Sequence, residues 1–416
     1  MASSTIRLAD VTARIGSGIT PRGGAAVYKT TGRPFVRSQN IGWGDLRLAD
    51  LAYIDDTTHA TFPATEIRVG DVLLNITGAS IGRSAVAPPE LEGGNVNQHV
   101  CEIRLKPGVM DPRYVNEVLN SRIGQDQINA FQAGGNRQGL NFQQVGSIRV
   151  PALDFDQQRA IGFASRDADG AIAALLRMIA KKEAIRRGMM QQLLTGTIRL
   201  PGFTEPWRDV LLGDDVSYVK TVALSRAQLD GESPVRYLHY GDIHRRTNVR
   251  MDAAHEPMPR ASSDFLRNSG RLRVGDLVFA DASEDPDGVG KSVEISSVPE
   301  AGVVPGLHTI AARFDEAILA DGFKAYLQFI PAFRQALLRV AAGTKVLATT
   351  RSYISGIALR LPGVDEQQAI ASTLSDAEFE IRRLHVRLAK ARDIKQGMMQ
   401  ELLTGRIRLP LAEAAA

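Results

Sequence analysis

The sequence predicts an α+β protein in which two globular domains are separated by two long antiparallel coiled-coil helices. Three observations support this class. A fourteen-residue stretch occurs twice, at residues 188–201 and 397–410, with twelve identical positions and an offset of 209 residues. Each copy ends a long apolar heptad pattern. The segments before the helices alternate short apolar runs with glycine turns, which is typical of α+β domains. We therefore expect domains at residues 1–152 and 201–363, helical spacers at residues 153–200 and 364–410, and a pseudo-twofold axis relating the halves.

The helices are predicted from apolar residues that step by alternating fours and threes, with no proline inside either run. Gly196 and Gly405, each followed by a proline, predict where the helices end. A helix of this length spans roughly 50 Å, whereas a domain of this size is only about 40 Å across. In a parallel pair, the second domain would have to carry the chain back along the full length of the helix. An antiparallel pair does not require this, so we expect that arrangement. The seam positions are Ile161, Ser165, Ala168, Ile172, Leu175, Ile179, Lys182, Arg186, Met189 and Leu193 in the first copy, and Ile370, Leu374, Ala377, Ile381, Leu384, Leu388, Ala391, Lys395, Met398 and Leu402 in the second.

Both globular segments show the same order of elements. In the first we expect strands at residues 6–11, 36–41, 66–76 and 100–105, followed by a helix at residues 111–120. Asp111 is placed to cap that helix, and Pro112 suits its first position. In the second we expect strands at residues 210–212, 235–239, 274–280 and 309–314, followed by a helix at residues 321–340.

Composition predicts a cytoplasmic protein. The lone Cys101 excludes a disulfide framework and fits a reducing compartment. No apolar run approaches the roughly 20 residues that a membrane span requires, and the N-terminus lacks the apolar core of a signal peptide. Residues 157–200 hold eight Lys and Arg against three Asp and Glu, and residues 366–409 hold eight against six. These basic stretches can attract phosphates, although most charge runs are simply solvated helix faces.

With these features the chain resembles the specificity subunits of type I restriction-modification enzymes. The resemblance rests on the helix entry at residues 151–161 and its echo at 362–370, the two helix exits, and Val-Gly-Asp at residues 69–71 and 274–276. It covers nearly the whole chain. It implies two target-recognition domains alternating with two spacer helices, in a non-catalytic subunit that reads a bipartite asymmetric DNA target. The implied partners are double-stranded DNA, two methyltransferase subunits and, in the full complex, two restriction (translocase) subunits.

The residues themselves give no catalytic site. Gly288-Val-Gly-Lys-Ser292 is similar to a phosphate loop, but Asp285 stands where that motif needs glycine. The Asn-Pro-Pro-aromatic and Asp-Pro-Pro-aromatic tetrapeptides of amine methyltransferases are absent, which disfavours a self-contained methyltransferase. The seven histidines and one cysteine lack metal-ligand spacing, so we expect neither metal nor cofactor.

Recognition of DNA is therefore expected from loops that differ between the two copies, because shared residues cannot read two different half-sites. Their Asn, Gln and Arg side chains offer paired hydrogen bonds to base edges. His99 and His308, which share the 209-residue offset, are assigned to the scaffold. The candidate DNA-binding residues are Thr20, Arg22, Arg37, Gln39, Asn40, Thr77, Arg83, Asn97, Gln98, Asn136, Arg137 and Asn141 in the first domain, and His239, Tyr240, His244, Arg245, Lys291, Lys345 and Arg351 in the second.

Partner subunits are expected at the two helix exits, because the duplication offers two equivalent surfaces. An adaptor that joins proteins through its coiled coil and never contacts DNA remains the alternative, since the same heptads would serve it. The candidate partner-binding residues are Met189, Met190, Leu193, Leu194, Met398, Met399, Leu402 and Leu403.

Overall fold

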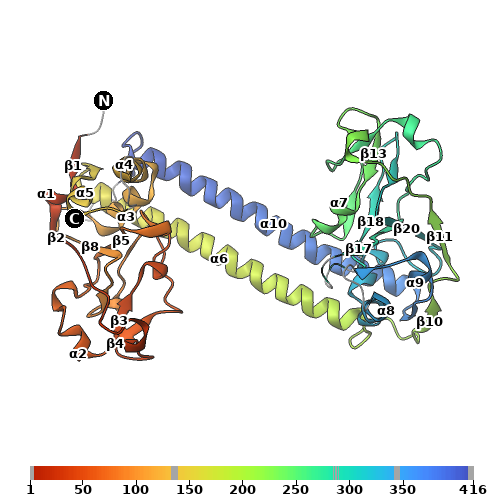
Figure 1. Ribbon diagram of the computed structural model, residues 1–416, viewed down its shortest axis with the longest axis horizontal. Coiled ribbons are helices and arrows are strands. Elements are labelled where there is room, and N and C mark those ends of the chain that lie inside the picture. Colours follow the sequence, from red (N-terminus) through yellow and green to blue (C-terminus); the bar gives the residue numbers. More distant parts are fainter. Residues whose placement is uncertain are drawn as a thin grey trace. The chain divides into compact units, whose positions relative to one another are not determined.

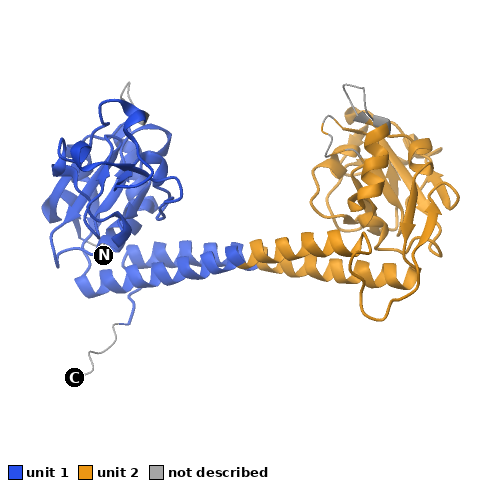
Figure 2. Ribbon diagram, turned by 90° about the horizontal axis from the view of Figure 1, so that it is seen from below, with its two compact units in different colours: residues 1–177, 386–416 blue, residues 178–385 orange. Residues whose placement is uncertain are grey.

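The computed structural model of the chain describes residues 4–410, apart from 133–138, 284, 286, 287, 289 and 342–346. It forms two compact units, residues 1–177 with 386–416 and residues 178–385, which Figure 2 colours separately. Each unit holds one globular domain of mixed helix and sheet, together with part of each of the two long helices (Figure 1). The two units are described in turn.

The domain of the first unit is built on a four-stranded sheet in the order β2-β8-β5-β6, a three-stranded sheet in the order β4-β3-β7, and the pair β1-β9. Its strands are β1 Thr5–Arg7, β2 Thr12–Ser17, β3 Arg33–Val36, β4 Ala52–Ile54, β5 Val72–Asn75, β6 Ser84–Val86, β7 Asn95–Val96, β8 Val100–Leu105 and β9 Arg149–Pro151. Its helices are α1 Leu8–Val11, α2 Asp56–His59, α3 Pro112–Asn120, α4 Arg122–Gln132 and α5 Phe142–Ser147, with short 3-10 turns at Gly24–Val27, Ser38–Asn40, Pro63–Thr65, Gly78–Ser80 and Pro89–Leu91.

The predicted helix after β8 is confirmed. The Asp111 carboxylate accepts hydrogen bonds from the backbone N–H groups of Arg113 (2.9 Å) and Tyr114 (3.0 Å), so it caps α3 as expected. The buried Tyr114 side chain then packs in one core with the central strands β5 and β8. The strand predicted at residues 6–11 is confirmed only for Ile6 and Arg7, which belong to β1. Leu8 and Val11 are buried with the i, i+3 spacing of a helical turn, and they form α1 between β1 and β2.

The domain of the second unit has a five-stranded sheet in the order β11-β20-β16-β18-β14, a four-stranded sheet in the order β12-β15-β13-β19, and the pairs β10-β22 and β17-β21. Its strands are β10 Arg208–Leu211, β11 Val216–Val219, β12 Leu229–Asp230, β13 Val235–Leu238, β14 Arg250–Asp252, β15 Arg260–Ala261, β16 Leu277–Ala280, β17 Ala282–Ser283, β18 Ser292–Ser297, β19 Val303–Pro305, β20 Thr309–Phe314, β21 Leu347–Ala348 and β22 Ala358–Leu361. Its helices are α7 Tyr240–His244, α8 Pro331–Ala341 and α9 Arg351–Ser355, with 3-10 turns at Arg226–Gln228, Ser263–Leu266 and Lys324–Phe329. The helix predicted at residues 321–340 is divided, because Pro331 starts a new helix after the 3-10 turn.

The two domains share one scaffold. In the first, Asp71 accepts the Arg68 backbone N–H (2.7 Å) and two hydrogen bonds from Arg104 (2.9 and 2.7 Å). In the second, Asp276 accepts the Arg273 backbone N–H (2.7 Å) and two from Arg313 (2.7 Å each). Gly70 and Gly275, which precede these aspartates, have φ values of 90° and 84°, where a side chain would be strained. The Val-Gly-Asp repeat is therefore a turn whose buried carboxylate is held by a half-buried arginine.

The long helices are α6 Phe155–Leu193 and α10 Val364–Leu403. In the first unit, Gln157 Nε2 donates to Leu409 O (2.8 Å) and Lys395 Nζ lies 2.7 Å from Asp169. In the second unit, Arg186 pairs with Glu378 (3.0 Å) and Lys182 with Glu380 (2.8 Å). Rising numbers in one helix meet falling numbers in the other, so the segments are antiparallel in each unit. Every predicted seam position is buried or half-buried, which confirms the heptad seam.

Candidate nucleic-acid interface

Most of the candidate DNA-binding residues of the first domain meet at one edge of its sheets. Four separate segments are tied together there by backbone hydrogen bonds. Asn97 N donates to Val36 O (3.0 Å), where β3 ends, and Ile76 N, where β5 ends, donates to His99 O (2.9 Å). Leu140 N, from the segment before α5, donates to Ile76 O (2.9 Å). Loops that are far apart in sequence thus form one continuous polar edge.

His99 lies at the centre of this edge. Its Nδ1 is 2.6 Å from Thr77 Oγ1 and its Nε2 is 2.9 Å from Gln98 Nε2. The Thr20 hydroxyl in turn donates to Gln98 Oε1. Thr20 and Gln98 are exposed, whereas Thr77 and His99 are half-buried. The ring of His99, which we assign to the scaffold, therefore contacts two candidate DNA-binding side chains directly, and Gln98 connects it to a third, Thr20.

Asn40 cannot contact a base in this structure, which corrects its prediction. Its side chain is 0% exposed. Its Oδ1 accepts the Arg37 backbone N–H (3.0 Å) and its Nδ2 donates to Arg47 O (2.9 Å). In the second domain Asp242 holds the same place, accepting the His239 backbone N–H (3.1 Å). Residue 40 is thus a loop-shaping residue. The strand predicted at residues 36–41 is wrong except for Val36, because β3 ends there and Ser38–Asn40 form a 3-10 turn.

Two further asparagines act mainly on the backbone. Asn97 is buried, and its Oδ1 accepts the His99 backbone N–H (3.1 Å), which closes the turn between β7 and β8. Its predicted contact with a base is therefore also corrected. Asn141 is exposed, but its Oδ1 caps α5 by accepting the Gln144 N–H (2.8 Å). These residues position the edge rather than face outward from it.

Among the remaining cationic side chains of this domain, one lies beside an aromatic residue that the sequence did not predict. The guanidinium of Arg83 lies 5.9 Å from the ring centroid of Trp43, whose side chain is 54% exposed. The Arg37 guanidinium lies 5.2 Å from the Tyr28 ring and donates to Asp50 O (3.0 Å). The sequence showed Trp43 between two glycines, but its exposure is known only from the structure. Arg22 and Gln39 are exposed. Asn136, Arg137 and Lys345 lie outside the described residues.

In the second domain the candidates gather around Tyr240, the first residue of α7. Its ring centroid lies 4.3 Å from that of His239, 5.9 Å from that of His244 and 5.5 Å from that of His308. His308 has a φ of 57°, in the left-handed region that strains a side-chain-bearing residue. Its Nδ1 lies 3.2 Å from Asp281 Oδ1. The counterpart of His99 is therefore also part of the edge, but it has different neighbours.

Burial lowers the pKa of two side chains around this cluster, His239 and Lys291. Desolvation lowers the pKa of His239 below its ordinary value, although the neighbouring Asp242 carboxylate opposes the shift, so its ring is neutral at pH 7. Desolvation also lowers the pKa of Lys291, whose ammonium donates to His244 O beneath α7. Arg245 is exposed beside this edge. Arg351 is exposed as well, and its guanidinium lies 5.5 Å from the Tyr218 ring.

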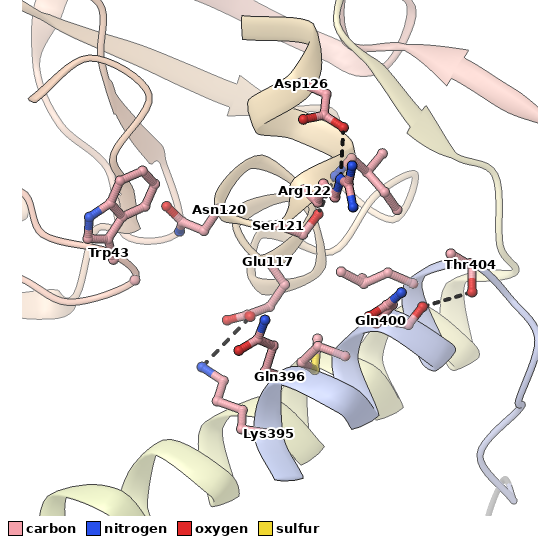
Figure 3. A pocket seen from close by; sticks show the side chains of 14 residues that line it. Trp43, Glu117, Asn120, Ser121, Arg122, Asp126, Lys395, Gln396, Gln400 and Thr404 are labelled. Atoms are coloured by element: carbon pink, nitrogen blue, oxygen red, sulfur yellow. Dashed lines mark hydrogen bonds and ion pairs between the residues drawn. The ribbon is translucent and has the colours of Figure 1, made fainter. Parts of the chain in front are cut away.

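A pocket of about 600 Å³ lies in the first unit between α3, α4 and the last turns of α10 (Figure 3). Trp43 and Asn120 line one side, and Gln396 and Gln400 line the other. At its floor Lys395 lies 3.8 Å from Glu117 and 2.7 Å from Asp169, so its charge is neutralised by two carboxylates. Burial raises the pKa of Glu117 and the neighbouring Lys395 lowers it. This pocket is therefore balanced in charge.

The predicted partner-binding residues are not available as a surface, which corrects their prediction as well. Met190, Leu193 and Leu194 are buried in the core of the second domain. Met399, Leu402 and Leu403 are buried in the core of the first, and Met189 and Met398 pack partly buried against the same two cores. The helix exits recur because each must anchor a helix to a domain. The exposed apolar residues of the helices lie elsewhere and include Phe163 at 39% and Phe379 at 57% exposure.

Within the described ranges no group of three or more His, Cys, Asp or Glu is placed to hold a metal ion. No helix in the same described ranges is long and apolar enough to cross a membrane. Burial raises the pKa of the Cys101 thiol to about 12, so it stays protonated.

Comparison with known proteins finds other chains that share this arrangement. No family model matches the chain. A protein of Methanocaldococcus jannaschii described as "Putative type I restriction enzyme MjaX specificity subunit" is 23% identical over 405 residues, spanning 91% of this chain and 88% of its own. The HsdS subunit of Thermoanaerobacter tengcongensis matches with a TM-score of 0.53 at 17% identity, covering 98% of this chain and 97% of its own.

Two further solved structures agree. The S subunit of the type I restriction-modification system of M. genitalium gives a TM-score of 0.58 at 11% identity, over 96% of this chain and 95% of its own. A chain from a structural study of complex assembly and conformational transition in the type I R-M system gives 0.59 at 18% identity, over 98% of both chains. The chain therefore has the fold of type I restriction-modification specificity subunits and resembles that family along nearly its full length.

Proposed function

We propose that this chain is the DNA-recognition subunit of a type I restriction-modification complex and that it reads a bipartite, asymmetric target. The observation that carries the proposal is the polar edge, which both domains build on the same scaffold with different side chains. Arg37 in the first domain corresponds to His239 in the second, since each follows the strand (β3 or β13) that pairs in parallel with β7 or β19. Gln98 corresponds to Leu307 at the 209-residue offset. One scaffold with two sets of side chains suits two different half-sites.

The chemistry of each edge fits base recognition. Gln98, Thr20 and Arg37 offer amide, hydroxyl and guanidinium groups, which pair with adenine and guanine edges in the major groove. The second edge offers imidazole, phenol and guanidinium groups from α7. His239 Nδ1 accepts the Gly241 backbone N–H (3.2 Å), so in the neutral ring Nε2 carries the proton and can donate a hydrogen bond there. We assign direct reading to these exposed or half-buried side chains and the holding of the loops to the buried asparagines.

We further propose that methyltransferase subunits dock on the outer faces of the long helices, one on each unit. Phe163 and Phe379 each follow a seam position, Ile161 or Ala377, by two residues, which places them on the face away from the seam. Three arginines lie around the Phe163 ring and one lies beside the Phe379 ring. Arg113, Arg159 and Arg166 lie 5.6, 6.0 and 4.9 Å from Phe163, and Arg383 lies 5.9 Å from Phe379. An exposed aromatic ringed by guanidinium groups suits a partner surface with apolar and acidic groups. Restriction subunits would join this complex as they do in the type I systems that the chain resembles.

A domain-duplication chimera tests the recognition proposal. Residues 208–361 are replaced by a second copy of residues 4–152, so that the junctions fall at the matched strand pairs β1-β9 and β10-β22. Co-expressed with its methyltransferase partner, this chimera should methylate an inverted repeat of one half-site, as a symmetric dimer reads a palindrome. The reciprocal chimera, with residues 208–361 in both places, is the matched control and should yield a palindrome of the other half-site.

Methylation mapping of the host genome gives the readout. A chimera that assembles and methylates at a non-palindromic site would refute modular reading. An assembled wild-type complex that never retains DNA would instead favour the coiled-coil adaptor.

A further inference from the structure

The side chain of Trp43 is 54% exposed on the first domain, although tryptophan is mostly buried in folded proteins. It stands on a tight turn whose backbone is fixed on both sides. The Gly42 N–H donates to Asp45 O (2.9 Å), and the Gly44 N–H donates to Ser84 O (2.9 Å), at the start of β6. Gly44 has a φ of 86°, where a side chain would be strained. The ring is therefore presented to solvent from a well-defined backbone.

This turn is joined to the polar edge of the first domain. It follows the 3-10 turn that begins at Ser38, whose carbonyl oxygen accepts a hydrogen bond from Asn75 Nδ2 (2.9 Å). The Asn75 N–H, at the end of β5, donates to Arg83 O (2.8 Å). The next residue, Ile76, donates its N–H to His99 O within the edge. Hydrogen bonds from the end of β5 thus connect the tryptophan turn with the loops to which we assign base reading.

Arg83 holds the ring in place. Its side chain is half-buried, and its guanidinium lies 5.9 Å from the centroid of the Trp43 ring. The following residue, Ser84, is anchored to α3, because its N–H donates to Asn120 Oδ1 (3.2 Å) and its carbonyl oxygen accepts from Asn120 Nδ2 (3.0 Å). A ring that is ordered before binding loses less conformational entropy when it contacts a ligand.

The second domain carries an arginine at the matched position. Asn40 and Asp242 hold the same place in the two domains, and three residues further on stand Trp43 and Arg245. Arg245 is exposed, and it is one of the candidate DNA-binding residues. A cation directly before β6 or β18 is present in both copies. The shared scaffold therefore keeps the supporting cation and changes the exposed side chain, as the reading of two different half-sites requires.

We propose that Trp43 reads a thymine of the first half-site by packing its ring against the C5 methyl group. In duplex DNA the faces of the bases are covered by stacking, so a protein in the major groove meets only their edges. Those edges present hydrogen-bond donors and acceptors, and the thymine methyl is the apolar group among them. An exposed aromatic ring beside the polar edge thus has one complementary group there. This inference rests on the proposed function.

The test measures the affinity of the assembled complex for duplex probes that carry its mapped target. In each probe one thymine of the first half-site is replaced by deoxyuridine, which removes only the methyl group. At the contacted position the wild type should lose about fourfold in affinity, which corresponds to about 0.8 kcal/mol for one buried methyl group. Trp43→Ala should bind the thymine and deoxyuridine probes equally. Trp43→Phe should keep the difference, because the phenyl ring still offers an apolar face.

Two controls separate this contact from general effects. Val69→Ala removes exposed apolar surface before the opposite end of β5, where the side chain is 53% exposed, and it should keep the wild-type difference between the probes. Deoxyuridine in the second half-site should affect the wild type and Trp43→Ala to the same extent. Urea unfolding verifies that each variant is folded.

A methyl-dependent loss of affinity that is absent in Trp43→Ala supports the proposal. Equal sensitivity of the wild type and Trp43→Ala at every thymine of the first half-site overturns it. An even loss of affinity on all probes also overturns it, because that pattern indicates a contact with the DNA backbone. Unchanged DNA affinity with loss of methyltransferase in native mass spectrometry would assign the ring to a protein interface instead. If the wild-type complex binds none of the probes, the proposed function fails and this inference fails with it.

Discussion

The fully buried leucine at the end of α10, Leu403, provides a sharp test of how the helices are anchored. It packs in the core of the first domain, where it is 0% exposed. Truncation to alanine removes three carbon atoms, which costs about 2.4 kcal/mol in transfer free energy at about 0.8 kcal/mol for each. The cavity left behind brings the expected loss to about 3–5 kcal/mol. The mirror variant is Leu194→Ala, at the equivalent place in the second unit, where Leu194 is 1% exposed.

The chain offers a built-in assay, because Trp43 and Trp207 are its two tryptophans and each lies in a different unit. Replacing one of them with Phe leaves a fluorescence reporter of the other unit. In urea, with an m-value of about 2 kcal/mol/M, Leu403→Ala should lower the midpoint seen by Trp43 by about 1.5–2.5 M. The midpoint seen by Trp207 should move much less, and Leu194→Ala should show the reverse pattern.

A matched control is Ile407→Ala, four residues beyond Leu403, where the side chain is 55% exposed and the expected change is below about 0.5 kcal/mol. The anchoring argument would be refuted if Leu403→Ala left the Trp43 transition in place. Failure of a Leu403→Ala chain of unchanged stability to bind methyltransferase would restore the partner-binding interpretation of the helix exit.

Three further predictions concern single side chains. Phe163→Ser and Phe379→Ser should each weaken retention of one methyltransferase subunit in native mass spectrometry without lowering stability, and unchanged two-to-one complexes for both would exclude these docking faces. Burial raises the pKa of Glu102 to about 7 from an ordinary value near 4.5. Its folded form therefore holds a proton that the unfolded chain loses, so stability should fall by up to about 3 kcal/mol as pH rises from 4.5 to 7. Glu102→Gln should flatten that fall in urea titrations, and an unaltered pH profile would contradict it. Asn40→Ala should cost about 2 kcal/mol of stability, because it removes the side-chain hydrogen bonds to the Arg37 N–H and to Arg47 O. The exposed neighbour variant Gln39→Ala should be nearly neutral in unfolding and act only on recognition of the half-site. Equal unfolding midpoints for the two variants would argue against the structural role of Asn40.

Much of the architecture could be predicted because its signals are local or repeated. The heptad seam is a local pattern, and every seam position is buried or half-buried. The Asp111 cap and the strands Val100–Leu105 and Thr309–Phe314 also follow from local signals, and the structure confirms them. The prediction errs where a short apolar run is compatible with both a strand and a helical turn. The segment at residues 6–11 could be a strand by composition, but the burial of Leu8 and Val11 together requires a helical turn.

The candidate site is predictable as a set of loops but not residue by residue. Asn40 and Gln39 are adjacent polar side chains, and only the packing of residues 47 and 50 against this loop decides that one is buried and the other exposed. Recurrence alone assigns His99 to the scaffold, yet its ring contacts Thr77 and Gln98, which do not recur. Repetition in the sequence identifies the residues that the two domains share. It does not determine where the side chain of a shared residue points.

The sequence by itself determined that the chain is one unit written twice, where its long helices run, and which residues face the seam between them. These follow from periodicity, because a helix or strand repeats its burial along the chain. Only the tertiary structure decided that the duplicated methionines and leucines at the helix exits belong to the domain cores, and that Phe163 and Phe379 are exposed instead. Only the fold brings Arg83 beside Trp43, from a segment about forty positions away. Burial against a distant segment and convergence of distant side chains both depend on chain closure in three dimensions, which no local pattern encodes.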